Sequence, residues 1–173
     1  FGEPWKLNNK LLKKVGNRFL DFMGIPMPEY RGGAHYSWMI LNKHFEGGCF
    51  LQNVNKNTIQ GYSDSGQYYM KLLYKYPKNL SIPNDYFKFS TKKEIAFLNN
   101  FIIKLKGNNN FKLKKMKNKG SINFPRLNTN LNGFIDWSYD VDELNRFINA
   151  FSSPYSGAST YYNNQRVYFK NSK

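Results

Sequence analysis

Cysteine and histidine are scarce in this chain of 173 residues. Its single cysteine, Cys49, excludes an internal disulfide and a metal site built from several cysteines. The two histidines, His35 and His44, add no metal-ligand spacing, so no metal site is predicted. No apolar run is long enough for a membrane span, no remnant of a secretory signal is visible, and no glycine-rich phosphate loop occurs. We therefore expect a cytoplasmic protein with a buried, unreactive Cys49 and no membrane partner.

Acidic residues are also few, 11 against 26 basic ones, which gives a net charge of +15 and a pI near 9.8. Only five of the basic residues are arginine, and lysine and asparagine are abundant together, as in proteins from AT-rich genomes. A lysine cluster surrounds Phe111, and it is either a solvated loop or a tRNA-binding patch. Its members are Lys104, Lys106, Lys112, Lys114, Lys115, Lys117 and Lys119.

Hydrophobic periodicity predicts alternating helices and strands, in one domain or one domain with a small appendage. Helices are expected at 7–15, 34–42, 90–107 (with Ser90 as N-cap) and 140–151 (with Asp140 as N-cap). Strands are expected at 18–22, 48–54 and 67–76, with a hairpin around Asn163-Asn164. The first helix and strand are typical of a parallel sheet. Residues 107–133 are expected to be irregular, anchored by Phe124-Pro125-Arg126-Leu127.

The stretch DFMGIPMPEYRGGAHYSW, residues 21–38, carries the strongest functional signal. Two prolines, Pro26 and Pro28, fix the backbone, and Gly32 and Gly33 permit conformations that other residues avoid. A rigid turn between a strand and a helix is where open α/β sheets hold their ligands. We interpret this stretch as the loop of a ligand site.

The same stretch resembles the signature of the formyltransferase family, Asn-x-His-x-Ser-x-Leu-Pro-x-Tyr-Arg-Gly. Pro28 and Tyr30-Arg31-Gly32 match it in spacing. The positions that carry chemistry differ: the family's Asn, His and Ser fall on Asp21, Met23 and Ile25. The resemblance thus implies the family's scaffold with altered catalytic positions.

The resemblance extends over most of the chain. Asp64-Ser65-Gly66 is the nearest match to the family's Asp-Thr-Gly turn, although a gap-free count puts Ile59 there, and residues 122–169 resemble the family's closing segment. The implied fold is α/β, the second half of a Rossmann-like catalytic domain plus a small C-terminal α+β segment ending in a hairpin. The expected parts are a catalytic half at 1–107, an irregular basic connection at 108–133 and a helix with a β-hairpin at 134–173.

By the same resemblance, the formyl donor is 10-formyltetrahydrofolate and the acceptor is an amine. The chain opens in a loop that lies well inside the family's catalytic domain, so we expect a fragment of a longer protein. The candidate residues are catalytic Asp64, Asp21 and Met23; cofactor-binding Gly2, Pro4, Trp5 and Ile59; and substrate-binding Arg31, Tyr30 and Tyr155. Two of these assignments have simpler alternatives: Arg31 can brace its own loop rather than hold a phosphate, and Trp5 can serve packing alone.

The altered positions restrict the chemistry. Met23 has a thioether with no proton to give. Asp21 places an acceptor where the family has an N–H donor, so it would repel a developing oxyanion unless it were protonated. One hypothesis is that Asp21 and Asp64 share a proton and one of them donates to the oxyanion; the alternative is that neither does chemistry.

Three functions follow from these observations. The first is N-formyl transfer to a nucleotide-linked amino sugar or to methionyl-tRNA, with Asp64 as the base and Asp21 in an altered role. The second is a catalytically impaired homologue that binds folate or a sugar nucleotide without turnover. The third is a tRNA or nucleic-acid binder driven by the lysines. The sequence predicts no oligomeric state.

Overall fold

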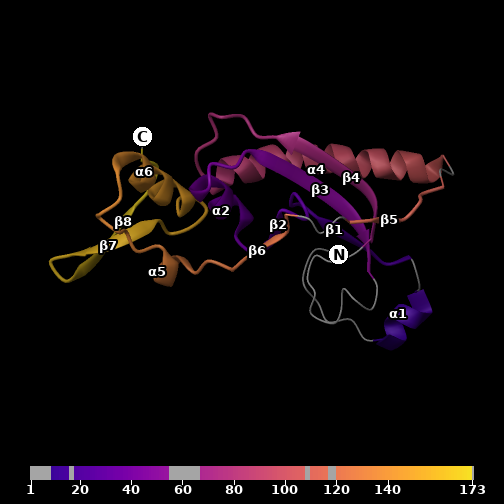
Figure 1. Ribbon diagram of the computed structural model, residues 1–173, viewed down its shortest axis with the longest axis horizontal. Helices are drawn as coiled ribbons and strands as arrows, with labels where there is room; N and C mark the ends of the chain where they lie inside the picture. Colours follow the sequence, from indigo (N-terminus) through magenta and orange to yellow (C-terminus); the bar gives the residue numbers. More distant parts are fainter. Residues whose placement is uncertain (1–8, 16–17, 55–66, 108–109, 117–119, 173) are drawn as a thin grey trace. The chain divides into compact units, whose positions relative to one another are not determined.

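The structure is a computed structural model that describes residues 9–15, 18–54, 67–107, 110–116 and 120–172 (Figure 1). The helices are α1 (Asn9–Val15), α2 (His35–Leu41), α4 (Pro83–Lys106), α5 (Thr129–Asn132) and α6 (Val141–Ala150). The strands are β1 (Leu20–Met23), β2 (Tyr30–Gly32), β3 (Glu46–Asn53), β4 (Gln67–Lys75), β5 (Lys114–Lys115), β6 (Ile122–Phe124), β7 (Ala158–Tyr162) and β8 (Gln165–Phe169). The mixed α/β class predicted from the sequence is confirmed.

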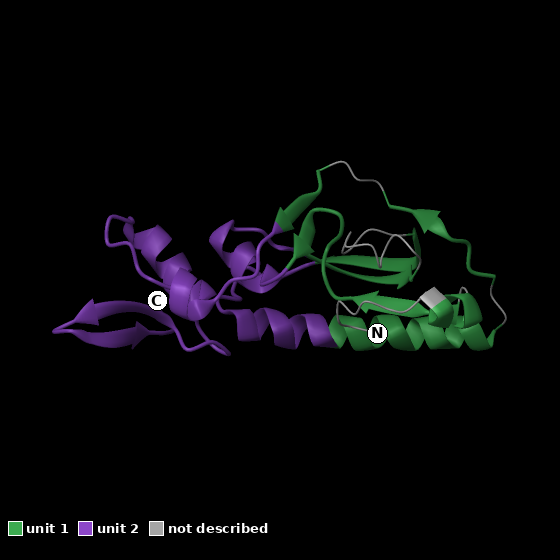
Figure 2. Cartoon of the chain, turned by 90° about the horizontal axis from the view of Figure 1, so that it is seen from below, with its two compact units in different colours: residues 1–32, 47–74, 92–123 green, residues 33–46, 75–91, 124–173 purple. Residues whose placement is uncertain are grey.

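Two compact units make up the chain (Figure 2). Unit 1 comprises residues 1–32, 47–74 and 92–123, and unit 2 comprises residues 33–46, 75–91 and 124–173. The chain passes between them several times, so each unit combines segments that are distant in the sequence. The sequence-based boundaries near residues 107 and 133 stay a prediction.

Unit 1 is built on a sheet with the strand order β1-β3-β4-β5. Strand β1 pairs with β3 in antiparallel register, with Asp21 opposite Gln52. Asn53 contacts Tyr69, and Gly48 lies against Leu72, so β3 and β4 also run in opposite directions. The predicted parallel arrangement of β1 is therefore wrong, because a strand's partner is chosen by tertiary packing and not by the helix that precedes it.

One face of this sheet packs against α4 in a hydrophobic core. Cys49 and Leu51 of β3 pack with Phe97 of α4, and all three are at most 4% exposed. Phe22 of β1 adds a ring contact with Phe97 at 6.3 Å between centroids. Figure 1 shows α4 running alongside β3 and β4. Burial of these side chains, at about 25 cal/mol per Å² of apolar surface, holds the helix to the sheet.

Helix α4 begins at Pro83, seven residues before the predicted start. Proline suits the first turn of a helix, where its missing N–H has no helical partner to lose. Ser90, the predicted N-cap, lies inside the helix and donates its hydroxyl to the Phe87 carbonyl. The end at Lys106, just before Gly107, is as predicted. The apolar residues Ile95, Ile102 and Leu105, which share one face, are each about half exposed.

The segment after α4 is more ordered than the sequence indicates. Lys115 of β5 pairs with Gln67 of β4, and β6 pairs with β2. These strands are two or three residues long, too short for a periodic signal. The predicted anchor at residues 124–127 is present: Trp38 donates its indole N–H to the Pro125 carbonyl at 2.9 Å and packs against the Phe124 ring.

Unit 2 contains α2, α6 and the hairpin of β7 and β8. Helix α6 starts at the predicted N-cap: the Asp140 side chain accepts the Glu143 N–H, and Glu143 in turn accepts the Asp140 N–H. Asn163 and Asn164 both have positive φ, as a two-residue hairpin turn requires. Helix and hairpin are thus where the local signals predicted them.

Candidate functional site

The signature loop begins on β1, and its first residue forms a polar pair. Gln52 Nε2 donates to Asp21 Oδ2 at 2.9 Å. The two residues are direct cross-strand partners, which places both side chains on one face of the sheet. Gln52 is 1% exposed, whereas Asp21 is half-buried. A carboxylate with a fixed amide donor therefore stands where the family signature has its asparagine.

Met23 lies two residues further along β1 and has apolar surroundings. It packs against the buried cluster of Ile25, Met27 and Phe50. A thioether in such a cluster adds dispersion contacts and no acid or base. The structure thus gives Met23 a packing contact at the family's histidine position.

Tyr30 and Arg31 follow the proline turn on β2. Tyr30 is 5% exposed, and its N–H donates to the Pro26 carbonyl at 3.0 Å, which closes the turn. Arg31 is half-buried and directs Nη2 toward Met116 Sδ at 3.9 Å. Sulfur is a weak acceptor, so this contact orients the guanidinium without neutralising it.

Glu94 of α4 reaches the backbone of the signature loop. Its Oε1 lies 2.6 Å from the point where a Cβ on Gly24 would be, so the loop needs glycine or a moved Glu94 here. Burial, together with the charge of Glu94, raises the pKa of the Cys49 thiol to about 12. Cys49 is accordingly a buried apolar residue, as the sequence predicts.

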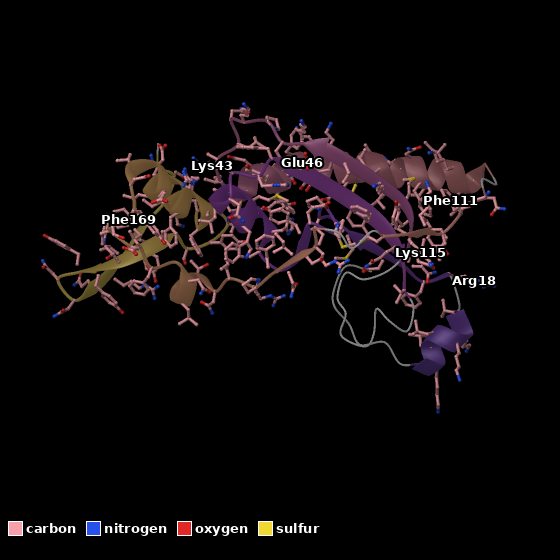
Figure 3. All side chains as sticks on the ribbon, viewed as in Figure 1. Arg18, Lys43, Glu46, Phe111, Lys115 and Phe169 are labelled. Carbon is pink, nitrogen blue, oxygen red and sulfur yellow. The ribbon has the colours of Figure 1, made fainter. Side chains whose placement is uncertain are left out.

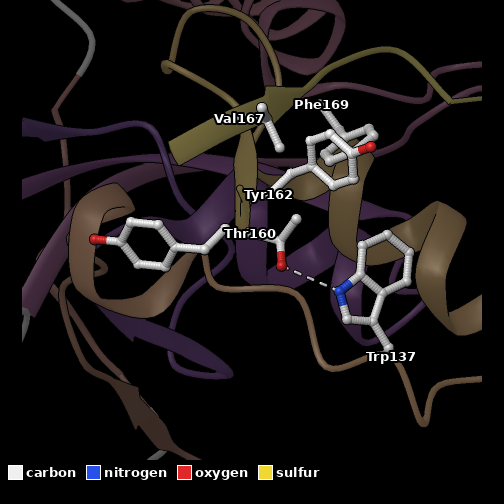
Figure 4. Close-up of a pocket in the computed structure, with 6 residues that line it drawn as sticks. Trp137, Thr160, Tyr162, Val167 and Phe169 are labelled. Carbon is white, nitrogen blue, oxygen red and sulfur yellow. Dashed lines mark hydrogen bonds between the residues drawn. The ribbon is translucent and has the colours of Figure 1, made fainter. Parts of the chain in front are cut away.

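In unit 2, the candidate substrate residue Tyr155 does not line the aromatic hollow described below. Tyr155 is half-buried, and its N–H donates to the Ser152 carbonyl. A hollow of about 500 Å³ lies instead on the hairpin (Figure 4). Trp137 donates its indole N–H to Thr160 Oγ1 at 3.1 Å and meets the Phe169 ring at 82°. The hollow is lined by Trp137, Thr160, Tyr161, Tyr162, Val167 and Phe169.

The sequence did not predict this hollow, and Trp137 was not among the candidate residues. The available signal was a pair of adjacent aromatic residues on each strand of the predicted hairpin, Tyr161-Tyr162 and Tyr168-Phe169. Because successive side chains of a strand point to opposite faces, Tyr162 and Phe169 share one face and Tyr161 lies on the other.

Several predicted site residues lie outside the part that the structure describes. These are Gly2, Pro4, Trp5, Ile59 and Asp64. The lysine cluster is described in part, with Lys115 on β5 and Phe111 shortly before it (Figure 3). Phe111 packs on Phe101 at 5.0 Å between ring centroids. The cluster's exposed described members are Lys104, Lys106, Lys112, Lys114 and Lys115, and Lys117 and Lys119 are outside the described ranges.

Residues 129–173 match the family described as formyl transferase, C-terminal domain. No curated protein matches the sequence. The match covers α5, α6 and the hairpin, the same elements whose local signals are strongest.

Solved structures match more of the chain. A methionyl-tRNA formyltransferase from Clostridium thermocellum is 16% identical, with a TM-score of 0.67 over 98% of this chain and 70% of its own. A 4-N formyltransferase from Francisella tularensis is 18% identical, with a TM-score of 0.69 over 89% of this chain and 62% of its own. The chain has the formyltransferase fold.

A third structure with this fold is WlaRD, a sugar 3N-formyl transferase determined in the presence of dTDP and 5-N-formyl-THF. It is 23% identical, with a TM-score of 0.58 over 78% of this chain and 47% of its own. The chain therefore spans about half the length of that enzyme. Within the described ranges, no helix of this formyltransferase-like chain is long and apolar enough to cross a membrane.

Proposed function

We propose that this chain is part of an N-formyltransferase, which moves a formyl group from 10-formyltetrahydrofolate to an amine. The observation that carries the proposal is the match of residues 129–173 to the formyl transferase C-terminal domain. The formyltransferase fold of the solved neighbours, one of them determined with 5-N-formyl-THF, supports the same reaction and donor. Position by position, the signature loop agrees in its scaffold residues, Pro28 and Tyr30-Arg31-Gly32.

The proposed acceptor is the amine of a nucleotide-linked sugar, with methionyl-tRNA as the alternative. WlaRD, a sugar 3N-formyl transferase determined with dTDP, supports the first, and the Clostridium enzyme supports the second. Arg31 is the candidate contact for a phosphate of either acceptor, because its planar guanidinium can bind phosphate oxygens in a bidentate manner and it stands at the arginine position of the signature loop. Tyr30 and Tyr155 are the other candidate substrate residues.

Among the described residues, Asp21 suits the proton-transfer step of this reaction. The tetrahydrofolate donor supplies an activated formyl carbon. An attacking amine must lose a proton, and a half-buried carboxylate at Asp21 is a suitable acceptor for it. Met23 takes no proton and contributes shape alone. The resemblance supplies the other candidates. Asp64 is the candidate base, and the candidates for binding the folate donor are Gly2, Pro4, Trp5 and Ile59.

The test is turnover by the full-length protein supplied with 10-formyltetrahydrofolate and a panel of amines. The panel holds sugar nucleotides with an amino group, methionyl-tRNA and small amines. We expect formylation of a sugar nucleotide and a loss of at least a hundredfold in kcat for Asp64→Asn. Asp136→Asn is the matched control, because Asp136 is exposed and the described bonds of its carboxyl group are to Ser138, two residues along the chain. No turnover on any amine class would contradict the proposal.

A second candidate function is binding of the same ligands without turnover. The packing of Met23 in an apolar cluster favours it, since the family's histidine position then has no proton-transfer group. Calorimetry with 5-formyltetrahydrofolate and with dTDP separates the two functions. Binding without formylation supports this second function, and absence of binding to both ligands rejects it.

A further inference from the structure

Gln52 is a buried polar residue on β3, where it follows the apolar run Cys49-Phe50-Leu51. It stands between Leu51 and Asn53 on β3 and is 1% exposed. A buried amide is destabilising unless it is hydrogen-bonded, so it calls for a physical reason. Its Nε2 donates to Asp21 Oδ2 at 2.9 Å, and its Oε1 has no hydrogen-bond partner in the described structure.

The direction of this hydrogen bond bears on the charge of Asp21. An amide N–H that points at a carboxyl oxygen stabilises the ionised carboxylate, because a carboxylate only accepts hydrogen bonds. A protonated Asp21 can accept this N–H at its carbonyl oxygen, but its O–H then needs an acceptor of its own, which the N–H side of the amide does not provide. The Gln52 side chain presents its N–H to Asp21, and that arrangement suits an ionised group.

The register of the sheet fixes this arrangement. Asp21 and Gln52 are opposite residues on β1 and β3, flanked by the pairs Leu20↔Asn53 and Phe22↔Leu51. Neither side chain can leave the face of the sheet without breaking the strand pairing. The amide is thus held in place before any ligand binds.

We propose that Gln52 is a positioning residue that keeps Asp21 ionised, so that Asp21 accepts the proton of the attacking amine. This inference rests on the proposed formyl transfer. In the step, the amine nitrogen forms a bond to the formyl carbon and loses a proton to Asp21. The bond between that carbon and the folate nitrogen then breaks, and the proton passes from Asp21 to the departing nitrogen. Asp21 then takes the base role that the resemblance gives to Asp64, and the hypothesis that Asp21 donates a proton to the oxyanion is replaced.

The direct test measures the ionisation of Asp21 in the full-length protein. Carbon-13 labelling of aspartate carboxyls allows an NMR pH titration, and Asp21→Asn assigns the Asp21 signal. Gln52→Met removes the donor with little change in volume. We expect the titration midpoint of Asp21 to rise by about one pH unit in Gln52→Met, a tenfold change in proton affinity. Gln52→His, which retains a ring N–H, is expected to restore part of the shift.

The control is Tyr69→Phe, which removes a different side-chain bond in the same sheet, from Asn53 Nδ2 to Tyr69 Oη at 3.2 Å. We expect Tyr69→Phe to leave the Asp21 titration unchanged. Two results would overturn the proposal: equal midpoints in wild type and Gln52→Met, or a protonated Asp21 in the wild type at neutral pH. If Gln52→Met fails to fold, the wild-type titration and Gln52→His still decide between the two charge states.

Kinetics then test the catalytic part. With Asp21 as the base, the acidic limb of the kcat/KM profile moves to higher pH in Gln52→Met by the same amount as the NMR midpoint, with KM nearly unchanged. If the NMR titration midpoint of Asp21 shifts and the acidic limb of the kcat/KM profile does not move, Asp21 is not the base. A shifted midpoint with no turnover on any amine rejects the proposed function, and the two failures are therefore distinguishable.

Discussion

At the scale of single residues, the thiol of Cys49 illustrates how burial removes reactivity. Its side chain is fully buried, and its pKa is raised to about 12 by burial and by Glu94, so the thiolate is absent at neutral pH. We expect no reaction with Ellman's reagent at pH 8 in the native protein and one equivalent of thiol in 6 M guanidinium chloride. Fast modification of the native protein would contradict this burial.

His35 makes stability depend on pH. Burial lowers its pKa to about 4 in the folded protein, whereas the unfolded value is about 6.5. Between these values the unfolded chain binds the proton more strongly. The free energy of unfolding therefore falls as pH drops from 6.5 to 4, with a contribution approaching about 1.4 kcal/mol per pH unit. Urea unfolding at pH 7 and pH 5 measures the slope, and we expect His35→Gln to flatten it. An unchanged slope in His35→Gln would contradict the role of His35.

The two polar partners on β1 and β3 differ in how far the sequence predicts them. Asp21 is found by comparison with a motif, which needs only residue spacing. Gln52 has no such signal, because its role depends on a cross-strand partner 31 residues away. The two amides Gln52-Asn53 at the end of an apolar run do not show which residue lies opposite them.

At the scale of elements, the capping box of α6 is a local device with a measurable contribution. The Asp140 side chain accepts the Glu143 N–H at 2.8 Å. Asp140→Ala leaves that N–H without its partner and should lower the free energy of unfolding by about 1 kcal/mol. Asp142→Ala is the control, since Asp142 lies in the same turn but is not the N-cap. Equal losses in the two variants would contradict a specific role of the cap.

Gly157 precedes the hairpin at a position that excludes a side chain. Its φ is +113°, and a Cβ there would lie 2.6 Å from the Phe169 carbonyl oxygen. Gly157→Ala should therefore destabilise the protein by about 2–3 kcal/mol, from backbone strain and a steric clash together. Gly120→Ala separates the two causes, because Gly120 has φ +79° with nothing within 4 Å. A thermal melt of each variant gives the comparison, and equal losses would leave strain as the only cause.

Elements with local signals were predicted well, and those decided by distant partners were not. Helix α6 and the turn at Asn163-Asn164 depend on residues within a few positions, and both are confirmed. The direction of β1 depends on β3, and the prediction was wrong. Ser90 resembled an N-cap, but its hydroxyl bonds a carbonyl inside α4, because Pro83 begins the helix earlier. Helix propensity does not distinguish Pro83 from Ser90 as the start of α4, because tertiary packing decides between them.

At the scale of the whole molecule, the net charge of +15 predicts non-specific binding of polyanions. Any affinity for a single-stranded oligonucleotide should fall at least tenfold between 50 and 200 mM salt, because lysine contacts release counterions. Fluorescence anisotropy measures it, and a Lys114→Glu, Lys115→Glu double variant should lessen the salt dependence. An affinity that does not change with salt concentration would reject the hypothesis that the lysine cluster binds nucleic acid.

The opposition of Asp21 and Gln52 across two strands has a consequence for evolution and engineering. A shift of β1 by one position would set Asp21 against Leu51 or Asn53 instead, so a deletion or insertion between the strands that changes their alignment would separate the pair. The length of the chain between β1 and β3 can therefore change only in ways that restore the alignment. In variant libraries, changes at the two positions should be tolerated together more often than singly.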